Sequence, residues 1–356
     1  MRIMCVDMDS FFASVEMAAN PILKQSPMAV AGSSERSVIL SASYSARAKG
    51  IRTGQSVQEA RKIYPDLRIV KASGKKYTYV SSQIAQYLLT ISPTARMSSI
   101  DEAFIDITDL EESPAEIAYK IKTWLKTHVG VTGSVGVGES YLLAKMASNV
   151  KKPDGYYEVL PGQRLTFMDG FSLRKIWGIG RRTVAKLNAL GLYKPSEVRA
   201  FGEEKLTELF GIPGAVIYRS CCGLDKNEEG RREDEPLKSI SHAITTPEDV
   251  QSREIAHAYL LQLSEAVSRR ARNRMYSGRT VSLTVREGTE GRKSYSFRQN
   301  LGYYTSATHH IYEAVQRLFE ANVPSETPIR LFGVGLDNLV HGGTSFSNME
   351  DMLDRK

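Results

Sequence analysis

Cysteine is scarce in this sequence, and long apolar runs are absent. Three cysteines occur in 356 residues, Cys5, Cys221 and Cys222, and their spacing fits neither a disulfide framework nor a zinc site. No window approaches the roughly 20 apolar residues that a membrane helix requires. These absences exclude a membrane protein and a disulfide-rich secreted protein, and we expect a protein of the reducing cytoplasm.

Low-complexity segments and repeat arrays are also absent, and the composition is that of a folded protein, with 42% hydrophobic and 24% charged residues. The length predicts about two to three domains. Residues 225–235 lack any large apolar side chain, and they contain six acids and three bases. A segment of this composition contributes nothing to a core, so we predict a linker at 225–238.

The positive charge is concentrated in one place. The net charge of the whole chain is +7, and a thirty-residue stretch accounts for all of it. Only two acids, Glu287 and Glu290, accompany its nine bases: Arg269, Arg270, Arg272, Arg274, Arg279, Arg286, Arg292, Lys293 and Arg298. Such a cluster indicates a surface that binds a polyanion.

The first half of the chain alternates strand and helix patterns. An apolar strand at 2–8 ends in acids, and a second strand follows the acidic pair Asp101-Glu102. Apolar spacing of three or four residues predicts helices at 75–91, 114–128 and 141–150. Shorter strands and helices at 28–64 form a small insert, a strand is predicted at 132–137, and Gly136-Val137-Gly138 at its end is predicted to be a turn. The pattern indicates an α+β sheet domain.

The second half divides into two smaller modules. Residues 173–190 predict two short helices around Trp177-Gly178-Ile179-Gly180. After the linker, apolar positions predict a helix near 255–267, an alternating strand at 280–286, a helix at 306–321 and a strand near 329–336. The last four elements indicate a separate α/β domain.

Acidic side chains follow or begin two of the predicted strands. Asp7 ends the first strand, and Asp101 and Glu102 begin another, so neighbouring strands would bring three carboxylates together. Three repelling anions need cations, and oxygen-only ligands suit Mg²⁺. Two such ions activate an attacking hydroxyl and stabilise a pyrophosphate leaving group. Such a centre would suit nucleotidyl transfer, but the acids taken alone fit surface positions at strand ends better, and the residues around them decide between the two interpretations.

Groups suited to a triphosphate lie elsewhere in the chain. Tyr44 and Arg47 are three residues apart, so both lie on one face of a predicted helix. The planar guanidinium of arginine binds phosphate by two parallel hydrogen bonds. Lys152, within Lys151-Lys152-Pro153-Asp154-Gly155, offers a further phosphate ligand.

Four ordered motifs resemble the Y-family of DNA polymerases, the lesion-bypass class, and within it the bacterial DNA polymerase IV branch. The resemblance covers nearly the whole chain. The motifs are Val6-Asp7-Met8-Asp9-Ser10-Phe11-Phe12-Ala13-Ser14-Val15-Glu16, Ala42-Ser43-Tyr44-Ser45-Ala46-Arg47, Ser99-Ile100-Asp101-Glu102-Ala103-Phe104 and Lys152-Pro153-Asp154-Gly155.

The resemblance implies a role for each matching residue. The metal-binding carboxylates of the family match Asp7, Asp101 and Glu102, with the carbonyl of Met8 as a further ligand of two Mg²⁺ ions. The residues that hold the incoming triphosphate match Tyr44, Arg47 and Lys152. The steric gate that excludes a ribose 2′-hydroxyl matches Phe12. By contrast, Asp9 is expected to be structural, as a cap on the backbone N–H groups at a helix start.

Primer–template DNA and deoxynucleoside triphosphates are the partners that the resemblance implies. Residues 173–190 resemble a helix–hairpin–helix, whose glycines permit close approach to DNA phosphates. We expect Gly178, Gly180, Arg181 and Arg182 to contact DNA there. Arg286 and Arg298, in the basic stretch, are expected to contact phosphates in the same sequence-independent way.

Polymerases of this branch usually carry a peptide that binds the sliding clamp at their C-terminal end, and the corresponding sequence of this chain is degenerate. Only Phe346 and Met349, within 343–349, resemble it, while Leu318 and Phe319 of a glutamine-containing segment are predicted to face a helix-packed core. Clamp binding therefore stays open, and we expect a monomer without membrane attachment.

The predicted fold is an α+β, right-hand polymerase. Its parts are a ferredoxin-like palm (1–10 and 75–165), fingers (11–74), a thumb with the helix–hairpin–helix (166–224), the linker (225–238), an α/β little finger (239–340) and a tail (341–356). The expected activity is low-fidelity translesion synthesis without proofreading. Two alternatives remain: another palm enzyme, such as a nucleotide cyclase, and a DNA-binding scaffold without turnover.

Overall fold

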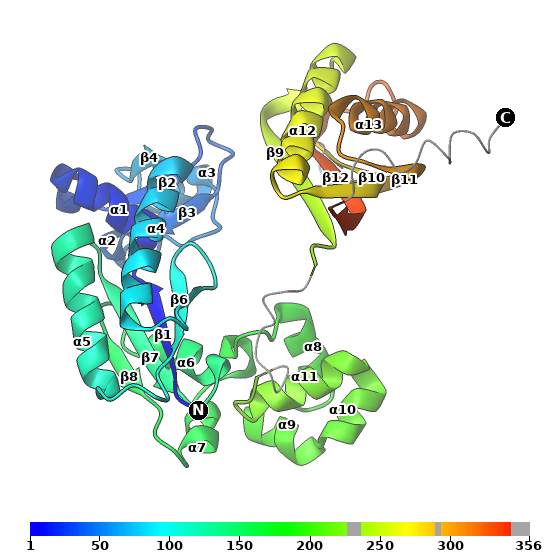
Figure 1. The fold of residues 1–356 in the computed structure, drawn as a ribbon. Coiled ribbons are helices and arrows are strands. Elements are labelled where there is room, and N and C mark those ends of the chain that lie inside the picture. The colour runs from blue at the N-terminus through cyan, green and yellow to red at the C-terminus, as the bar shows by residue number, and fades with distance from the viewer. Residues whose placement is uncertain (226–235, 289–292, 343–356) are drawn as a thin grey trace. The chain divides into compact units, whose positions relative to one another are not determined.

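The computed structural model describes residues 1–225, 236–288 and 293–342. The chain divides into two compact units, Met1–Arg231 and Arg232–Lys356, drawn in Figure 1. Most of the predicted linker and the whole stretch around Phe346 and Met349 lie outside the described residues. In the part of the chain that is described, no helix combines the length and apolar character needed to span a membrane.

The centre of the first unit is a five-stranded sheet with the order β5-β6-β1-β7-β8. Its strands are β1 (Ile3–Met8), β5 (Arg96–Met97), β6 (Glu102–Asp106), β7 (Gly133–Gly138) and β8 (Tyr156–Glu158). The central strand β1 runs antiparallel to both β6 and β7. The first apolar run of the sequence is therefore buried on both faces of the sheet.

Alternation along β1 divides the core into two layers. Met4, Val6 and Met8 belong to a large cluster with helices α1 (Phe11–Ala19), α4 (Gly74–Ile91) and α5 (Pro114–Trp124); Figure 1 shows α4 and α5 beside this sheet. Ile3 and Cys5 pack instead with Ala144 of α6 (Tyr141–Ser148). Because side chains alternate along a strand, Asp7 follows Ile3 and Cys5 onto the α6 face.

The glycines of β7 determine how closely α6 approaches this face. Gly136 and Gly138 lie opposite Cys5 and Ile3, and a Cβ at Gly136 would overlap the backbone of Ala144 and Ser148. The prediction of a turn at Gly136-Val137-Gly138 was wrong, because these glycines serve close helix–strand packing within a strand.

A small three-stranded sheet, β3-β2-β4, is inserted between α1 and α4. It contains β2 (Met28–Ala31), β3 (Ile39–Ala42) and β4 (Arg68–Lys71), with the short helices η1 (Pro21–Gln25), α2 (Tyr44–Ala48) and α3 (Val57–Ile63). Ser56 and Glu59 form a capping box that begins α3. This insert has its own small apolar core.

The end of the first unit is helical. A π-helical turn, η2 (Leu125–Val129), extends α5, and the later elements are α7 (Arg164–Asp169), η3 (Leu173–Lys175), α8 (Arg181–Ala189), α9 (Pro195–Phe201), α10 (Glu203–Phe210) and α11 (Ile212–Cys221). Their core includes Leu142, Leu143 and Met146 of α6 as well as Cys221. Helix α6 therefore packs against the sheet on one side and this helical module on the other.

The second unit is a four-stranded antiparallel sheet, β11-β10-β12-β9, with two helices. Its elements are β9 (Ser239–Val250), α12 (Arg253–Asn273), β10 (Tyr276–Glu287), β11 (Ser294–Thr305), α13 (Thr308–Asn322) and β12 (Ile329–His341). Val281, Leu283 and Val285 are buried in a core with α12 and α13. The predicted alternation at 280–286 is confirmed, whereas β9 and β11 were not predicted.

We expect Gly136→Ala to lower the free energy of unfolding by about 1–3 kcal/mol, the usual cost of overpacking a core. The added methyl group must push α6 away from β7. Urea unfolding measures the change. As a control, Gly74→Ala at the start of α4 adds a methyl group with no atom within 4 Å, and it should leave stability unchanged or slightly higher.

Candidate active site

The carboxylates of Asp7 and Glu102 lie on one face of the sheet because the two residues are register partners across β1 and β6. Both residues are buried, with 7% and 8% of their surface exposed. Two buried anions in neighbouring positions repel one another and are costly unless they are paired with cations. The local structure therefore requires positive charge on the α6 face.

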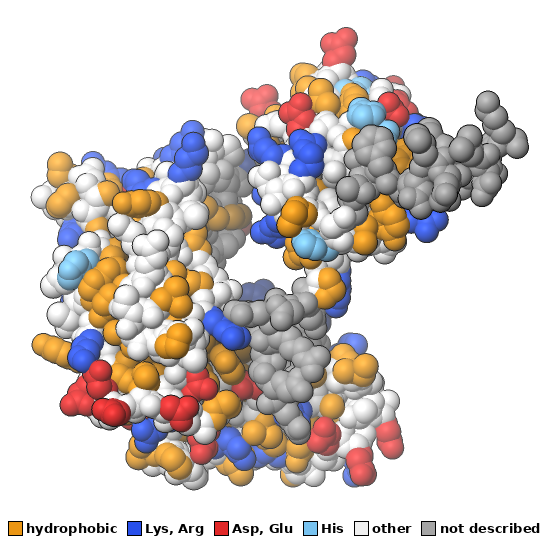
Figure 2. Space-filling view, in the orientation of Figure 1, with side chains coloured by type: hydrophobic (Ala, Val, Ile, Leu, Met, Phe, Trp, Pro, Cys, Tyr) orange, Lys and Arg blue, Asp and Glu red, His pale blue; other side chains and the backbone are white. Residues whose placement is uncertain are grey.

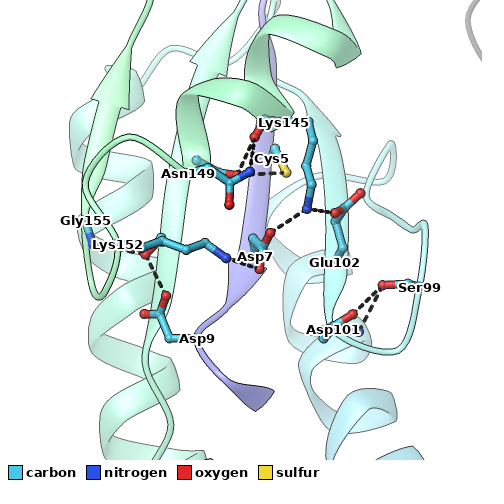
Figure 3. A network of polar contacts seen from close by, with 12 residues as sticks. Cys5, Asp7, Asp9, Ser99, Asp101, Glu102, Lys145, Asn149, Lys152 and Gly155 are labelled. Carbon is cyan, nitrogen blue, oxygen red and sulfur yellow. Dashed lines mark hydrogen bonds and ion pairs between the residues drawn. The ribbon is translucent and has the colours of Figure 1, made fainter. Parts of the chain in front are cut away.

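Lysine side chains supply this charge. Lys145 of α6 forms ion pairs with both acids: its Nζ lies 2.5 Å from Asp7 Oδ2 and also contacts Glu102 Oε2. Lys152 Nζ lies 2.5 Å from the other oxygen of Asp7, as Figure 3 shows. Burial opposes a charge on Lys145, but attraction and hydrogen bonds from the two acids outweigh it and raise the pKa of Lys145.

The position of Lys145 is fixed from the N-terminal end of α6. Asp225 accepts hydrogen bonds from the backbone N–H groups of Tyr141 and Leu142, at 3.0 and 2.9 Å. Ser140 donates from its hydroxyl to the carbonyl of Gly223. Asp225, at the start of the predicted linker, thus caps the helix that carries Lys145.

Asp101 lies at the same end of the sheet but is turned to another partner. Its carboxylate accepts a hydrogen bond of 2.6 Å from Ser99, and Figure 3 shows this pair beside Glu102. The backbone carbonyl of Asp101 accepts from Met8 N–H. Sequence reasoning correctly expected neighbouring strands, but the three carboxylates do not converge on one point in this structure.

The donor set suits a hard divalent cation, since it consists of carboxylate oxygens held at adjoining strand ends. Within residues 1–225, 236–288 and 293–342, however, no three His, Cys, Asp or Glu side chains form a ready-made metal cluster. Lys145 and Lys152 contact the oxygens that a cation would use. A cation bound between Asp7 and Glu102 would therefore compete with Lys145.

A cavity of about 340 Å³ adjoins these acids. Seven of the residues predicted for the site line this cavity: Asp7, Met8, Phe12, Tyr44, Arg47, Asp101 and Lys152. The seven come from the end of β1, the residue before β6, helix α1, helix α2 of the insert and the segment after α6. Glu102 is not among the lining residues and contacts Lys145.

Phe12, which lines the cavity, is stacked on a buried aromatic ring. The ring of Phe12 lies on that of Tyr77, with centroids 4.2 Å apart and planes inclined by 10°. The Tyr77 hydroxyl donates to buried Glu16 at 2.8 Å, and Lys76 pairs with the same carboxylate. Burial and the nearby Glu16 raise the pKa of Tyr77 to about 12, so its hydroxyl remains a donor and the stack is held in place.

Tyr44 and Arg47 face the cavity from α2. Ser43 caps this helix by accepting from Ala46 N–H, and Arg47 Nε donates to the carbonyl of Ala42 at 3.0 Å. The guanidinium lies 5.3 Å from the centroid of the Tyr44 ring. Burial and the neighbouring Asp9 raise the pKa of Tyr44 to about 12, so it is a neutral donor at physiological pH.

The expectation that Asp9 caps the following helix was wrong. Helix α1 begins after Ser10, and no side chain caps it. The Asp9 carboxylate instead accepts from Ser134 Oγ at 2.8 Å and from Asp154 N–H at 2.7 Å, with Tyr44 Oη 3.4 Å away. These partners lie far from Asp9 in the sequence, so the local pattern of an acid before a helix wrongly predicted a helix cap.

Ser10, which the sequence did not single out, also lines the cavity. It has left-handed backbone angles and is 7% exposed. Its hydroxyl has no hydrogen-bond partner among the described residues. A buried donor beside a cavity is available to a ligand.

The predicted DNA contacts in the first unit lie at the start of α8. Gly178 has a φ of 93°, which favours glycine, and Gly180 is the N-cap of α8. Both glycines are exposed around buried Ile179, and Arg181 and Arg182 are exposed in the first turn. The turn therefore presents backbone N–H groups and two cations to solvent.

In the second unit, Arg286 and Arg298 are exposed on the sheet face opposite the helices. Ser282 is the register partner of Arg298, and Ser294 that of Arg286. Figure 2 shows Lys and Arg side chains at several places on the visible face of this unit. Phe319, in the glutamine-containing segment that was considered for clamp binding, is 2% exposed and belongs to the core, as predicted.

Known proteins resemble this chain over nearly its whole length. The family model of the impB/mucB/samB family matches residues 6–149, its C-terminal domain matches 237–348, and its helix–hairpin–helix motif matches 161–192. DNA polymerase IV of Moorella thermoacetica is 35% identical, over 95% of this chain and 86% of the relative. DNA polymerase IV 2 of Agrobacterium fabrum is 32% identical, over 99% of each chain.

A solved Y-family DNA polymerase chimera shares the fold, with a TM-score of 0.82 and 24% identity over 96% of this chain and all of that one. The fold and the relatives define a DNA-directed DNA polymerase of the Y family. The chain belongs to the impB/mucB/samB family, in which its relatives are DNA polymerases IV. The predicted family and the α+β polymerase fold class are confirmed, and enzymes of this class depend on divalent metal ions.

We expect Lys145→Met to lower the free energy of unfolding in the presence of a chelator by about 3 kcal/mol, the usual cost of breaking a buried ion pair. Asp7 and Glu102 would then face each other with one cation fewer. Mg²⁺ should recover part of the loss. Urea unfolding with and without Mg²⁺ measures both effects.

The control is Lys120→Met, which removes an exposed ion pair with Glu112. Exposed pairs add little to stability, so this variant should unfold like the unmodified protein under both conditions. Equal behaviour of the two variants would contradict the role of Lys145.

Proposed function

We propose that this enzyme extends a primer 3′-hydroxyl with deoxynucleotides on a DNA template, including damaged templates, with two Mg²⁺ ions per active site. The observation that carries the proposal is the cavity beside Asp7 and Asp101, because it also contains Tyr44, Arg47 and Lys152. Acids suited to metal ions thus adjoin donors suited to phosphates. A nucleotide cyclase would not need the two predicted DNA-contacting regions.

Asp7, Asp101, Glu102 and the carbonyl of Met8 would hold the metal ions. When bound, the ions supply activation of the primer hydroxyl and stabilisation of the pyrophosphate leaving group. The protein's own contribution is to hold these oxygens at the ends of β1 and β6, where register already aligns Asp7 with Glu102. To reach a metal ion, the Asp101 carboxylate needs only to give up its hydrogen bond from Ser99, a local contact between residues two apart in sequence.

Donors around the cavity would bind the incoming triphosphate. Arg47 and Lys152 provide charge, Tyr44 provides a neutral hydroxyl, and the hydroxyl of Ser10, which has no partner in the part of the chain that is described, is a further donor. Lys152 contacts Asp7 in this structure, so substrate phosphate would draw it away from that acid. The arrangement supports binding of a polyanion next to the metal-binding carboxylates.

Phe12 would select deoxynucleotides by occupying the space of a ribose 2′-hydroxyl. Its stack on Tyr77, which Glu16 holds, supports a ring that resists displacement. Gly178, Gly180, Arg181 and Arg182, and separately Arg286 and Arg298, would contact DNA phosphates without reading sequence.

We further propose low fidelity, without proofreading. The predicted fingers, 11–74, consist of α1 and the insert, a three-stranded sheet with short helices, so they offer little surface to test the shape of a new base pair. The elements in the described residues are all assigned to synthesis or DNA binding. Tolerance of distorted templates follows, and it suits a role in DNA damage tolerance.

Asp101→Ala tests the proposed function. We expect primer extension with Mg²⁺ to fall by about 10³-fold or more, as when a group that stabilises a transition state is removed, while affinity for primer–template DNA is retained. A gel assay of primer extension and a DNA-binding titration measure the two effects. Asp109→Ala, which changes an exposed acid beyond the other end of β6, is the control, and extension by Asp101→Ala at control level would refute the metal assignment.

Phe12→Ala should admit ribonucleotides. The discrimination between deoxy- and ribonucleotides, as a ratio of kcat/KM values, should fall by about tenfold or more, because a pocket that loses a ring no longer excludes one oxygen. Tyr79→Ala alters an exposed ring on α4 and should keep the discrimination. Unchanged sugar selectivity in Phe12→Ala would refute the gate.

A further inference from the structure

Asp9 is a buried carboxylate without a direct catalytic assignment. It is 0% exposed, and no ion pair to it is found among the described residues. A buried charge of this kind is costly unless hydrogen bonds compensate it. Its hydrogen-bond partners therefore indicate what the residue does.

The firmest of these bonds reach the segment that carries Lys152. Asp154 N–H donates to Asp9 Oδ2 at 2.7 Å. Ser134 of β7 donates to Asp9 Oδ1 at 2.8 Å and accepts from Gly155 N–H at 3.2 Å. Asp9 and Ser134 together attach residues 154–155 to the ends of β1 and β7.

The backbone of this segment has an unusual conformation at Asp154, and hydrogen bonds from neighbouring elements stabilise it. Asp154 has a positive φ of 54°, which is unusual for a residue other than glycine. Its own carboxylate pairs with Lys122 and Lys126 of the α5–η2 helix. Asp9 thus holds the backbone of Asp154, while the two lysines hold its side chain.

A third hydrogen bond of Asp9 reaches Tyr44, another of the predicted phosphate ligands. Tyr44 Oη lies 3.4 Å from Asp9 Oδ1, a longer and weaker bond than the other two. Tyr44 belongs to the insert and Lys152 follows α6, so no shared element of secondary structure aligns them. The Asp9 carboxylate contacts both sides.

We propose that Asp9 is a positioning residue for the triphosphate: it holds the Lys152 segment, and secondarily Tyr44, in the geometry that binds the incoming nucleotide. This inference rests on the proposed function, in which Lys152 binds phosphate. It assigns Asp9 to substrate binding through its neighbours and not to metal coordination.

Two variants of Asp9 separate these roles. Asp9→Ala removes all three contacts, and the KM for the incoming deoxynucleotide should rise roughly tenfold, with kcat changed by less than about threefold, as expected for lost hydrogen bonds to a charged group. Asp9→Asn keeps an acceptor for Asp154 N–H, and the hydroxyls of Ser134 and Tyr44 can rotate to accept from its amide. It should recover most of the affinity.

A metal ligand would behave in the opposite way. Asp9→Asn would then be as damaging as Asp9→Ala, kcat would collapse, and Mn²⁺ binding measured by electron paramagnetic resonance would weaken. That pattern would overturn the proposal. A purely structural role would lower the melting temperature of Asp9→Ala without changing KM at a temperature well below melting, and this result would also overturn it.

A double-mutant cycle with Lys152→Ala completes the test. If Asp9 acts through Lys152, the double variant should have nearly the KM of Lys152→Ala alone, because the two effects are coupled. Additive effects, or a normal KM in Asp9→Ala beside a raised KM in Lys152→Ala, would overturn only the role of Asp9. A normal KM in Lys152→Ala would instead refute the phosphate assignment of Lys152, and the positioning role with it.

Discussion

The repulsion between Asp7 and Glu102 is the constraint on which the first unit depends. Strand register places the two acids side by side on a buried face, and this arrangement is stable only with cations close by. Helix α6 meets that need by carrying Lys145 to both acids. The approach of α6 requires Gly136 and Gly138 on the strand that it packs against. The two glycines therefore allow Lys145 to come close enough to neutralise Asp7 and Glu102.

The same constraint links folding to chemistry. Acids that lysines balance in the protein alone are suited to exchange those lysines for metal ions, and a lysine released in this way is free to pair with a substrate phosphate. Asp9 lies two residues beyond Asp7, past the end of β1 at Met8, and its carboxylate accepts hydrogen bonds from Ser134 of β7 and from Asp154 of the Lys152 segment. Two aspartates in one short motif therefore have different roles, because only the first lies within the strand and the second meets other neighbours.

Much of this organisation could be predicted from the sequence. Apolar spacing gave α4 and the alternating core of β10, and the four polymerase motifs identified seven residues that line one cavity. Strands β9 and β11 were missed because few of their side chains are buried, three of twelve in β9 and one of twelve in β11, so no clear apolar alternation marks them. Lys145 resembled an ordinary surface lysine of an amphipathic helix, and the partners of Asp9 lie 125 and 145 residues away. Pairings of that kind depend on strand register, which no local pattern encodes.

The central claim is that the acids at the ends of β1 and β6 form a two-metal centre for nucleotide addition. The most direct measurement counts bound Mn²⁺ by electron paramagnetic resonance, in a complex with a chain-terminated primer, its template and the correct deoxynucleotide. The account predicts about two ions per chain in the unmodified enzyme, as two-metal catalysis requires, and fewer in Asp7→Asn. The same number of ions in both proteins, or none in either, would contradict it.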